Sequence, residues 1–194
     1  AFVRLTGKSL FGPKWSLGYS GSTMHYTDAP DAQNQLMSFI KLCDEHAIPC
    51  DSFQLSSGYT SINNKRYVFN WNYDKVPQPK VRSQSCHDAG IKLAANIKPC
   101  LLQDHPRYQE VVEQGLFIKD SEQDSPERSI FWDDEGSHLD FTNPATVKWW
   151  QNGVTTQLLE MGIDSTWNDN NEYEVWDGEA RCHGFGEEIA IKNI

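Results

Sequence analysis

Four short apolar stretches, separated by stretches with helical character, are the feature that most constrains the fold of this chain. Alternation of strands and helices produces a parallel sheet whose faces are covered by the connecting helices. The sequence therefore predicts an α/β fold of about four βα units within residues 1–194. The strand-like stretches end near residues 20, 55, 98 and 169, and the longest helical stretches occupy 31–47, 78–91 and 143–162.

Two arrangements of such units are open from the pattern alone. In a (β/α)8 barrel and in an open doubly wound sheet, ligands bind at the carboxyl ends of the strands. The sequence lacks the glycine-rich phosphate-binding motifs of nucleotide-binding sheets, which disfavours the second arrangement. Four βα units are half of a barrel, and residues 182–194 begin a further amphipathic segment. We therefore expect a truncated chain that carries the first half of a (β/α)8 TIM barrel.

Charge and composition narrow the classes of partner. A formal net charge of -10 disfavours binding to nucleic acid or to anionic membrane surfaces, and no apolar stretch is long enough to span a bilayer. The five cysteines are scattered without C-x-x-C spacing, which is typical of free thiols in a reducing compartment and predicts a cytoplasmic location. The histidines show no spacing typical of metal ligands, so we expect no metal site.

Residues 164–178, "DSTWNDNNEYEVWDG", place acids, amides and aromatic rings directly after the fourth strand-like stretch. A carboxylate at the carboxyl end of a barrel strand is fixed in place and accessible, as a reacting group must be. Asp169 is therefore a candidate reacting group, although from the residues alone an aspartate at this position is more typical of a turn cap.

Five segments together resemble glycoside hydrolase family 31, the α-glucosidase family. They are "GPKWSLGY", "AIPCDSF", "GLFIKD", "LDFTNPATVKWW" and "IDSTWNDNNE", which occur in the family's order and at roughly its spacing, from about residue 12 to 186. The resemblance implies a (β/α)8 barrel and retaining cleavage or transfer of α-linked glycosyl units, without metal or organic cofactor. Retaining cleavage needs two carboxyl groups about 5 Å apart, one as nucleophile and one as acid/base.

The resemblance also assigns roles to individual residues. Asp169 matches the family's nucleophile, and Glu172 matches a glutamate that would hold a sugar hydroxyl or orient its neighbours. Trp167 and Asn168 precede the nucleophile, and Trp167 would form a wall of the sugar site. Trp132 would line the substrate cleft.

Two further candidates lie near other strands. Asp51, in "IPCD", would lie at the pocket-facing end of the second strand, with a buried structural carboxylate as an equal alternative. Lys98 replaces the acid that usually follows the third strand, and Gly58 replaces the second aspartate of a D-x-D-Y stretch. We expect these two changes to alter the preference for the cleaved sugar.

The acid/base should come from a later barrel strand, because nothing marks Asp133, Asp134 or Glu135 as a general acid. The isolated chain should then have little activity without the remaining barrel half, and its exposed sheet edge could drive self-association. Two alternatives stay open: a transglycosidase with the same nucleophile, and a non-catalytic half-barrel that binds carbohydrate through Trp132 and Trp167.

Overall fold

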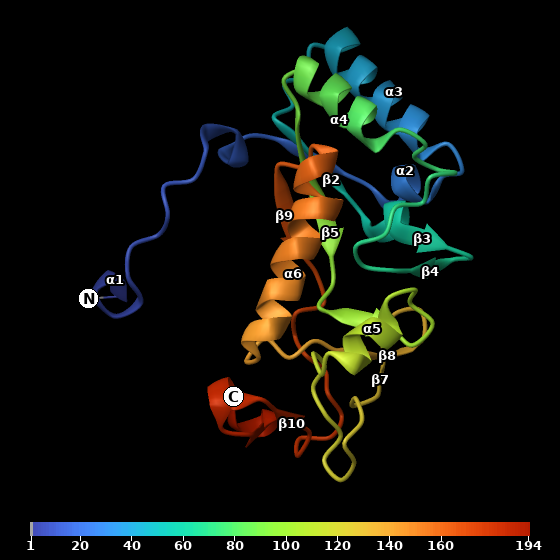
Figure 1. Ribbon diagram of the computed structural model, residues 1–194. Coiled ribbons are helices and arrows are strands. Elements are labelled where there is room, and N and C mark those ends of the chain that lie inside the picture. Colours follow the sequence, from blue (N-terminus) through green and yellow to red (C-terminus); the bar gives the residue numbers. More distant parts are fainter. Residues whose placement is uncertain (1) are drawn as a thin grey trace.

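A four-stranded parallel sheet forms the centre of the computed structural model, which describes residues 2–194 (Figure 1). The strands pair in the order β1-β2-β5-β9, which is also their order along the chain. A doubly wound sheet reverses its strand order at a switch point, whereas a barrel does not. The order therefore confirms the α/β class and the barrel arrangement. The strands span Ser20–Ser22 (β1), Ser52–Leu55 (β2), Lys92–Ile97 (β5) and Ser165–Asn168 (β9).

Three long helices connect these strands and cover one face of the sheet (Figure 1). They are α3 (Ala32–Glu45), α4 (Pro79–Asp88) and α6 (Pro144–Gln157). Alternate residues of the strands, such as Phe53, Leu93 and Ile97, belong to the buried core that these helices share. Burial of this apolar face is the main contribution that holds helices and sheet together.

Local sequence explains where the last helix begins and where its connection to β9 turns. The side chain of Asn143 caps α6 by accepting a hydrogen bond from the backbone N–H of Ala145 at 2.9 Å. Pro144, at the first helical position, lacks an N–H that would need a partner there. After α6, Gly162 has φ of +85°, a conformation that glycine adopts without strain, and the chain turns into β9.

Shorter elements gather beyond the carboxyl ends of the parallel strands (Figure 1). After β2 comes a hairpin, and after β5 comes a three-stranded antiparallel sheet of order β6-β8-β7 with one helix. These insertions form the surroundings of the site described below. Their bounds are Ser61–Ile62 (β3), Lys65–Arg66 (β4), Cys100–Leu102 (β6), Ser129–Ile130 (β7), Glu135–His138 (β8) and Tyr108–Glu113 (α5).

The remaining elements lie towards the two ends of the chain and beside β1. They are α1 (Phe2–Thr6), α2 (Met24–Asp28), and the antiparallel pair β10 (Arg181–Cys182) and β11 (Ile189–Ala190). Short 3-10 turns occupy Lys14–Leu17, Ser57–Thr60, Leu159–Met161, Gly184–Gly186 and Ile191–Asn193. No helix within residues 2–194 combines the length and the apolar character that crossing a bilayer requires.

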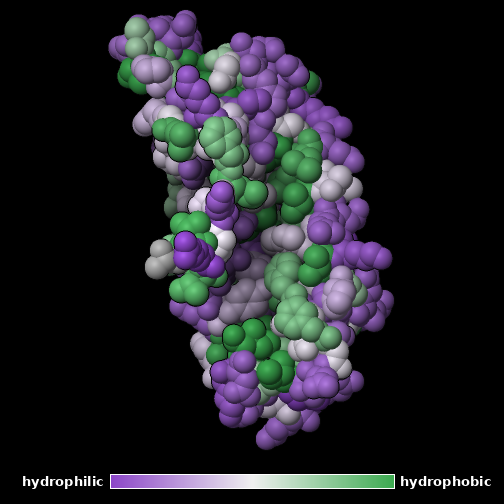
Figure 2. Space-filling view, turned by 90° about the vertical axis from the view of Figure 1, so that its left-hand side faces the viewer, coloured by the Kyte–Doolittle hydropathy of each residue, from purple (hydrophilic) through white to green (hydrophobic). Residues whose placement is uncertain are grey.

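Within residues 2–194, the second face of the parallel sheet is not covered by a helix. Gln54, Ala94 and Trp167 lie on this face, because they alternate with the core residues of their strands. Figure 2 shows a face of the molecule that is hollowed near its middle and mixes hydrophobic with hydrophilic side chains. In a complete barrel this face of the sheet would point into the barrel interior.

Candidate active site

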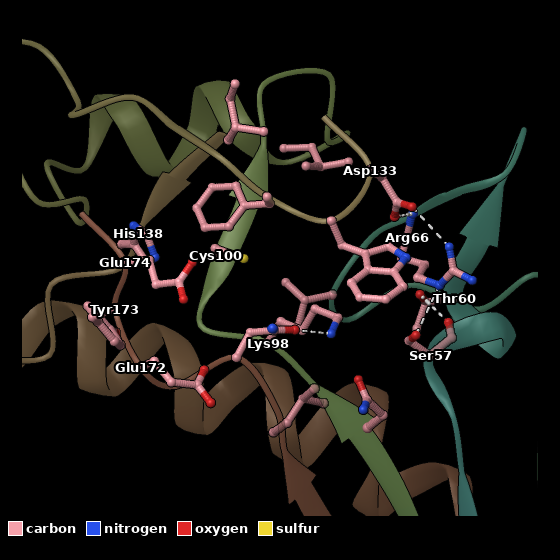
Figure 3. Close-up of a pocket in the computed structure, with 18 residues that line it drawn as sticks. Ser57, Thr60, Arg66, Lys98, Cys100, Asp133, His138, Glu172, Tyr173 and Glu174 are labelled. Carbon is pink, nitrogen blue, oxygen red and sulfur yellow. Dashed lines mark hydrogen bonds and ion pairs between the residues drawn. The ribbon is translucent and has the colours of Figure 1, made fainter. Parts of the chain in front are cut away.

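A pocket opens at the carboxyl ends of β5 and β9 and is walled by the insertions (Figure 3). It encloses about 260 Å³. Lys98 follows β5, Glu172 follows β9, and Trp132 comes from the loop between β7 and β8. The pocket thus draws on segments far apart in sequence. Its other polar lining residues are Ser57, Thr60, Arg66, Asn96, Asp133, His138, Asn170, Tyr173 and Glu174.

Asp169 directly follows β9 and is not itself one of the lining residues, but it lies beside the pocket because it contacts Asn96, Lys98 and Asn170, which line it. Its Oδ2 accepts hydrogen bonds from Lys98 Nζ at 2.5 Å and from Asn96 Nδ2 at 3.0 Å. Its Oδ1 accepts the backbone N–H of Asn170 at 3.1 Å. Partial burial raises the pKa of Asp169, but the bonds from Lys98 and Asn96 outweigh burial and hold that pKa below its usual value. Asp169 is therefore kept as a carboxylate.

The backbone after Asp169 turns sharply. Asn170 and Tyr173 have φ of +52° and +55°, in the left-handed region that few non-glycine residues adopt. Asn171 Nδ2 donates to the carbonyl of Asp169 at 3.0 Å, and the Tyr173 hydroxyl donates to the carbonyl of Leu139 at 2.8 Å. These bonds fix a strained segment beside the carboxylate, and strain of this kind is typical of functional sites.

Trp132 is held at the rim of the pocket by its acidic neighbours in sequence. Asp133 accepts Arg66 Nη1 at 2.9 Å and the backbone N–H of Arg66 at 2.8 Å. Asp134 accepts Lys65 Nζ at 2.5 Å. The indole itself is 73% exposed, so the clamp between the loop and the β3–β4 hairpin, rather than burial, positions it.

Residues 10–190 match the model of the TIM-barrel domain of glycosyl hydrolases family 31. The chain belongs to this family. The match confirms the resemblance that the five sequence segments predicted, and it agrees with the strand order of the sheet.

Relatives from the family are several times longer than this chain. The α-xylosidase XylQ of Lactiplantibacillus pentosus is 30% identical over 88% of this chain and 22% of its own length. Human neutral α-glucosidase AB is 29% identical over the whole chain and 21% of its own length. The structure of a family 31 dextranase from Flavobacterium johnsoniae, complexed with glucose, superposes with a TM-score of 0.81 at 24% identity, over 94% of this chain and 22% of that one. The chain therefore spans about a fifth of the curated relatives it matches.

The structure corrects the expected place of Asp51. Asp51 precedes β2, and its backbone pairs with Tyr19 and Lys92 at the amino-terminal edge of the sheet. Its carboxylate lies against Gly18, where a Cβ would be 2.0 Å from Asp51 Oδ2. The prediction of a pocket-facing Asp51 was wrong because the strand begins after this residue rather than ending near it. The carboxyl end of β2 is Leu55.

The other sequence candidates divide between the pocket and the two faces of β9. Lys98, Trp132 and Glu172 line the pocket, and Glu172 is exposed there. Trp167 pairs in register with Asn96 and shares its face of the sheet, as strand alternation predicted. Asn168 pairs with the core residue Ile97 and therefore belongs to the opposite face, so the structure does not bring it together with the pocket residues.

Packing against α2 explains why position 58 is a glycine in this chain. A Cβ at this position would lie 2.2 Å from Asp28 Oδ1 and 2.7 Å from the backbone of Thr27. The space that a side chain of residue 58 would occupy is thus filled by α2. An aspartate at position 58 would require α2 to move.

Asn96 is a site residue that was not predicted from the sequence. It is 3% exposed and donates to Asp169, while its Oδ1 has no hydrogen-bond partner within residues 2–194. The sequence did carry one signal. Asn96 and Lys98 are two positions apart, and residues two apart in a strand point to the same face of the sheet. Within residues 2–194, no group of three His, Cys, Asp or Glu side chains is placed to hold a metal ion.

Proposed function

We propose that this chain supplies the nucleophile half of a retaining α-glycosidase active site, with Asp169 as the nucleophile. The observation that carries the proposal is the ionised Asp169, held by Lys98 and Asn96, two residues that line the pocket. A nucleophilic carboxylate must be unprotonated, fixed and open to the substrate. The whole protein would act on α-linked glucosides or related sugars, since its relatives include enzymes named α-glucosidase and α-xylosidase.

In the first step, a carboxylate oxygen of Asp169 attacks the anomeric carbon, and the bond from that carbon to the leaving oxygen breaks. The leaving oxygen takes a proton from the general acid. Water, deprotonated by the same group, then attacks the anomeric carbon and releases Asp169. Oδ1 is the freer attacking atom, because it accepts one backbone hydrogen bond whereas Oδ2 accepts two from side chains.

The general acid is proposed to lie outside residues 1–194. A general acid needs a raised pKa, yet the acids of the loop beside Trp132 are engaged with cations. Asp133 pairs with Arg66, and Glu135 accepts Arg128 Nη2 at 2.6 Å. The hydrogen bond from Lys65 lowers the pKa of Asp134. The remaining barrel half would provide the acid, as well as the other walls of the sugar site.

Lys98 and Glu172 are proposed to set the sugar preference. Lys98 places a cation at the position after β5 where the family resemblance implies an acid. Its Nζ also contacts Asp169. Glu172 and Trp132 line the pocket and can bind a sugar through hydroxyl and ring contacts, respectively. Trp167 lies on the barrel-facing side beside Asn96 and is proposed as a deeper wall.

The test is covalent trapping. The protein that contains this chain and the rest of its barrel is incubated with a 5-fluoro-α-glycosyl fluoride, and the adduct is mapped by peptide mass spectrometry. We expect one sugar on Asp169, and none in Asp169→Asn. Asp177→Asn, which alters an exposed acid of the same segment, is the matched control and should still be labelled.

Three other results would change the proposal. A sugar on a different carboxylate would overturn the role of Asp169. Binding without any adduct would favour a non-catalytic carbohydrate-binding barrel. An adduct on Asp169 that passes mainly to added acceptor sugars rather than to water would identify a transglycosidase.

A further inference from the structure

A buried acid–histidine pair contributes its histidine to one wall of the pocket and has no part in the mechanism above. Glu127 and His138 are 3% and 2% exposed. Glu127 Oε1 accepts His138 Nδ1 at 2.9 Å and the backbone N–H of His138 at 2.6 Å, and Glu127 Oε2 accepts Ser129 Oγ at 2.7 Å. The carboxylate therefore holds both the ring and the backbone of His138.

The ring of His138 is also fixed by aromatic neighbours. Phe131 lies edge-on with its ring centroid at 4.6 Å, and the centroid of Tyr173 lies at 4.9 Å. Phe131 and Tyr173 line the same pocket as His138. The imidazole thus has one orientation, set by two aromatic neighbours and by the hydrogen bond at Nδ1.

This orientation leaves Nε2 unused. Since Nδ1 faces Glu127, the edge that carries Nε2 points away from the buried carboxylate, and His138 lines the pocket near Cys100 and Glu174 (Figure 3). Within residues 2–194, Nε2 has no hydrogen-bond partner, although all other polar atoms of this side-chain pair are satisfied. Nε2 is not one of the inaccessible polar atoms without a partner in residues 2–194, so it can be reached from the pocket and is open to a ligand.

Stability does not explain the pair. Desolvation of two ionisable groups offsets most of their attraction, so a buried acid–histidine pair contributes little compared with an apolar pair of the same volume. A fixed imidazole facing a cavity is, by contrast, a common way to present one hydrogen-bonding atom to a ligand.

We propose that His138 is a specificity-determining residue whose Nε2 hydrogen-bonds one hydroxyl of the bound carbohydrate, and that Glu127 is its positioning residue. A hydroxyl fits because it donates to Nε2 of a neutral ring and accepts from Nε2–H of a charged ring. The inference rests on the proposed function, since it assumes a carbohydrate in this pocket. It adds a contact on the wall formed by β8, across the pocket from the β3–β4 hairpin (Figure 3).

The test uses two variants that separate the two nitrogens. His138→Asn keeps an amide near the place of Nδ1, so that Glu127 stays hydrogen-bonded, but has no atom at the place of Nε2. His138→Gln places its amide near the position of Nε2. Both are made in the protein with its complete barrel, and thermal unfolding is measured for each. The probes are glucose, xylose and the monodeoxy glucoses, with binding measured by calorimetry.

We expect the native protein to bind one monodeoxy glucose about tenfold more weakly than glucose, the effect of one lost hydrogen bond. His138→Asn should bind glucose about tenfold more weakly but show no further loss with that same deoxy sugar. His138→Gln should recover part of the affinity. Because coupling to a single hydroxyl is the readout, a general loss of structure does not reproduce it.

The inference is overturned if His138→Asn weakens every sugar equally while each deoxy sugar keeps its penalty, or if no sugar binds the native protein. Labelling of Asp169 by the fluoride reagent decides the proposed function separately. Labelled Asp169 without hydroxyl coupling at His138 removes only this inference, whereas unlabelled Asp169 with coupling intact removes only the nucleophile.

Discussion

The hydrogen bond from Lys98 to Asp169 helps to keep the Asp169 carboxylate ionised. Burial of Asp169 favours the protonated form, and the donors Lys98 and Asn96 reverse that preference. If Asp169 is the nucleophile, it works only when ionised, and activity falls as the pH drops through its pKa. The lowered pKa therefore extends activity towards acid pH.

We predict that Lys98→Met raises the pKa of Asp169 and moves the acid limb of the kcat/KM profile to higher pH. The sign follows because burial remains while the strongest donor is lost. Lys92→Met is the matched control, since Lys92 pairs with Asp164 at the amino end of the sheet at 3.1 Å. The profile of the control should keep its acid limb, and an unmoved or more acidic limb in Lys98→Met would contradict the prediction.

Single residues also show the limits of prediction from sequence. The motif around Asp169 was sufficient to place it at a strand end, because polar residues followed an apolar run directly. The same logic failed for Asp51, where the apolar run began before the residues that pair as β2. Asn96 was missed because an amide inside an apolar strand carries no sign of its partner, which is 73 positions away in sequence.

At the scale of elements, the β3–β4 hairpin and the Trp132 loop act as one unit. The two lie more than sixty residues apart in sequence and are joined by Lys65 and Arg66. The strands of the hairpin pair Ser61 with Arg66 and Ile62 with Lys65. Asn63 and Asn64, with φ of +49° and +65°, form the tight turn between them. The ion pairs themselves could not be predicted, because loop contacts depend on the fold already being in place.

We predict that Arg66→Met destabilises the protein by about 2 kcal/mol, the usual effect of losing charged hydrogen bonds to a mostly buried carboxylate. Arg66 and Asp133 side chains are 14% and 11% exposed, so water replaces the lost contact poorly. The variant should also bind sugar more weakly, because Trp132 loses its fixed position. Urea unfolding and sugar titration measure the two effects.

Arg128→Met provides the comparison for that experiment. It removes the ion pair with Glu135, in which the side chains of Arg128 and Glu135 are 58% and 40% exposed. Exposed ion pairs of this kind contribute less than about 1 kcal/mol to the free energy of unfolding. Equal destabilisation by Arg66→Met and Arg128→Met would show that the hairpin does not clamp the loop.

On the scale of the whole molecule, periodicity in the sequence was enough to predict the parallel sheet and its connecting helices. Strand ends at Ser22, Leu55, Ile97 and Asn168 compare with expected ends near 20, 55, 98 and 169. The insertions beyond the strands were not predicted in detail, since two-residue strands such as β7 have no periodicity to detect. The pocket is made largely from these insertions, so its shape needed the structure.

Both outer strands of the parallel sheet have one neighbour each within residues 2–194. Unpaired strand edges pair readily with other chains, and charged side chains on an edge strand oppose such pairing. We therefore predict that copies of residues 1–194, prepared as a separate chain, associate with one another, so that light scattering gives a mass above 22.2 kDa.

Thr166→Lys adds a charge at an exposed position of the edge strand β9 and should shift the population towards monomer. Thr155→Lys makes the same change on the exposed face of α6 and should leave association unchanged. If the unaltered chain is a monodisperse monomer, its open edges do not drive association.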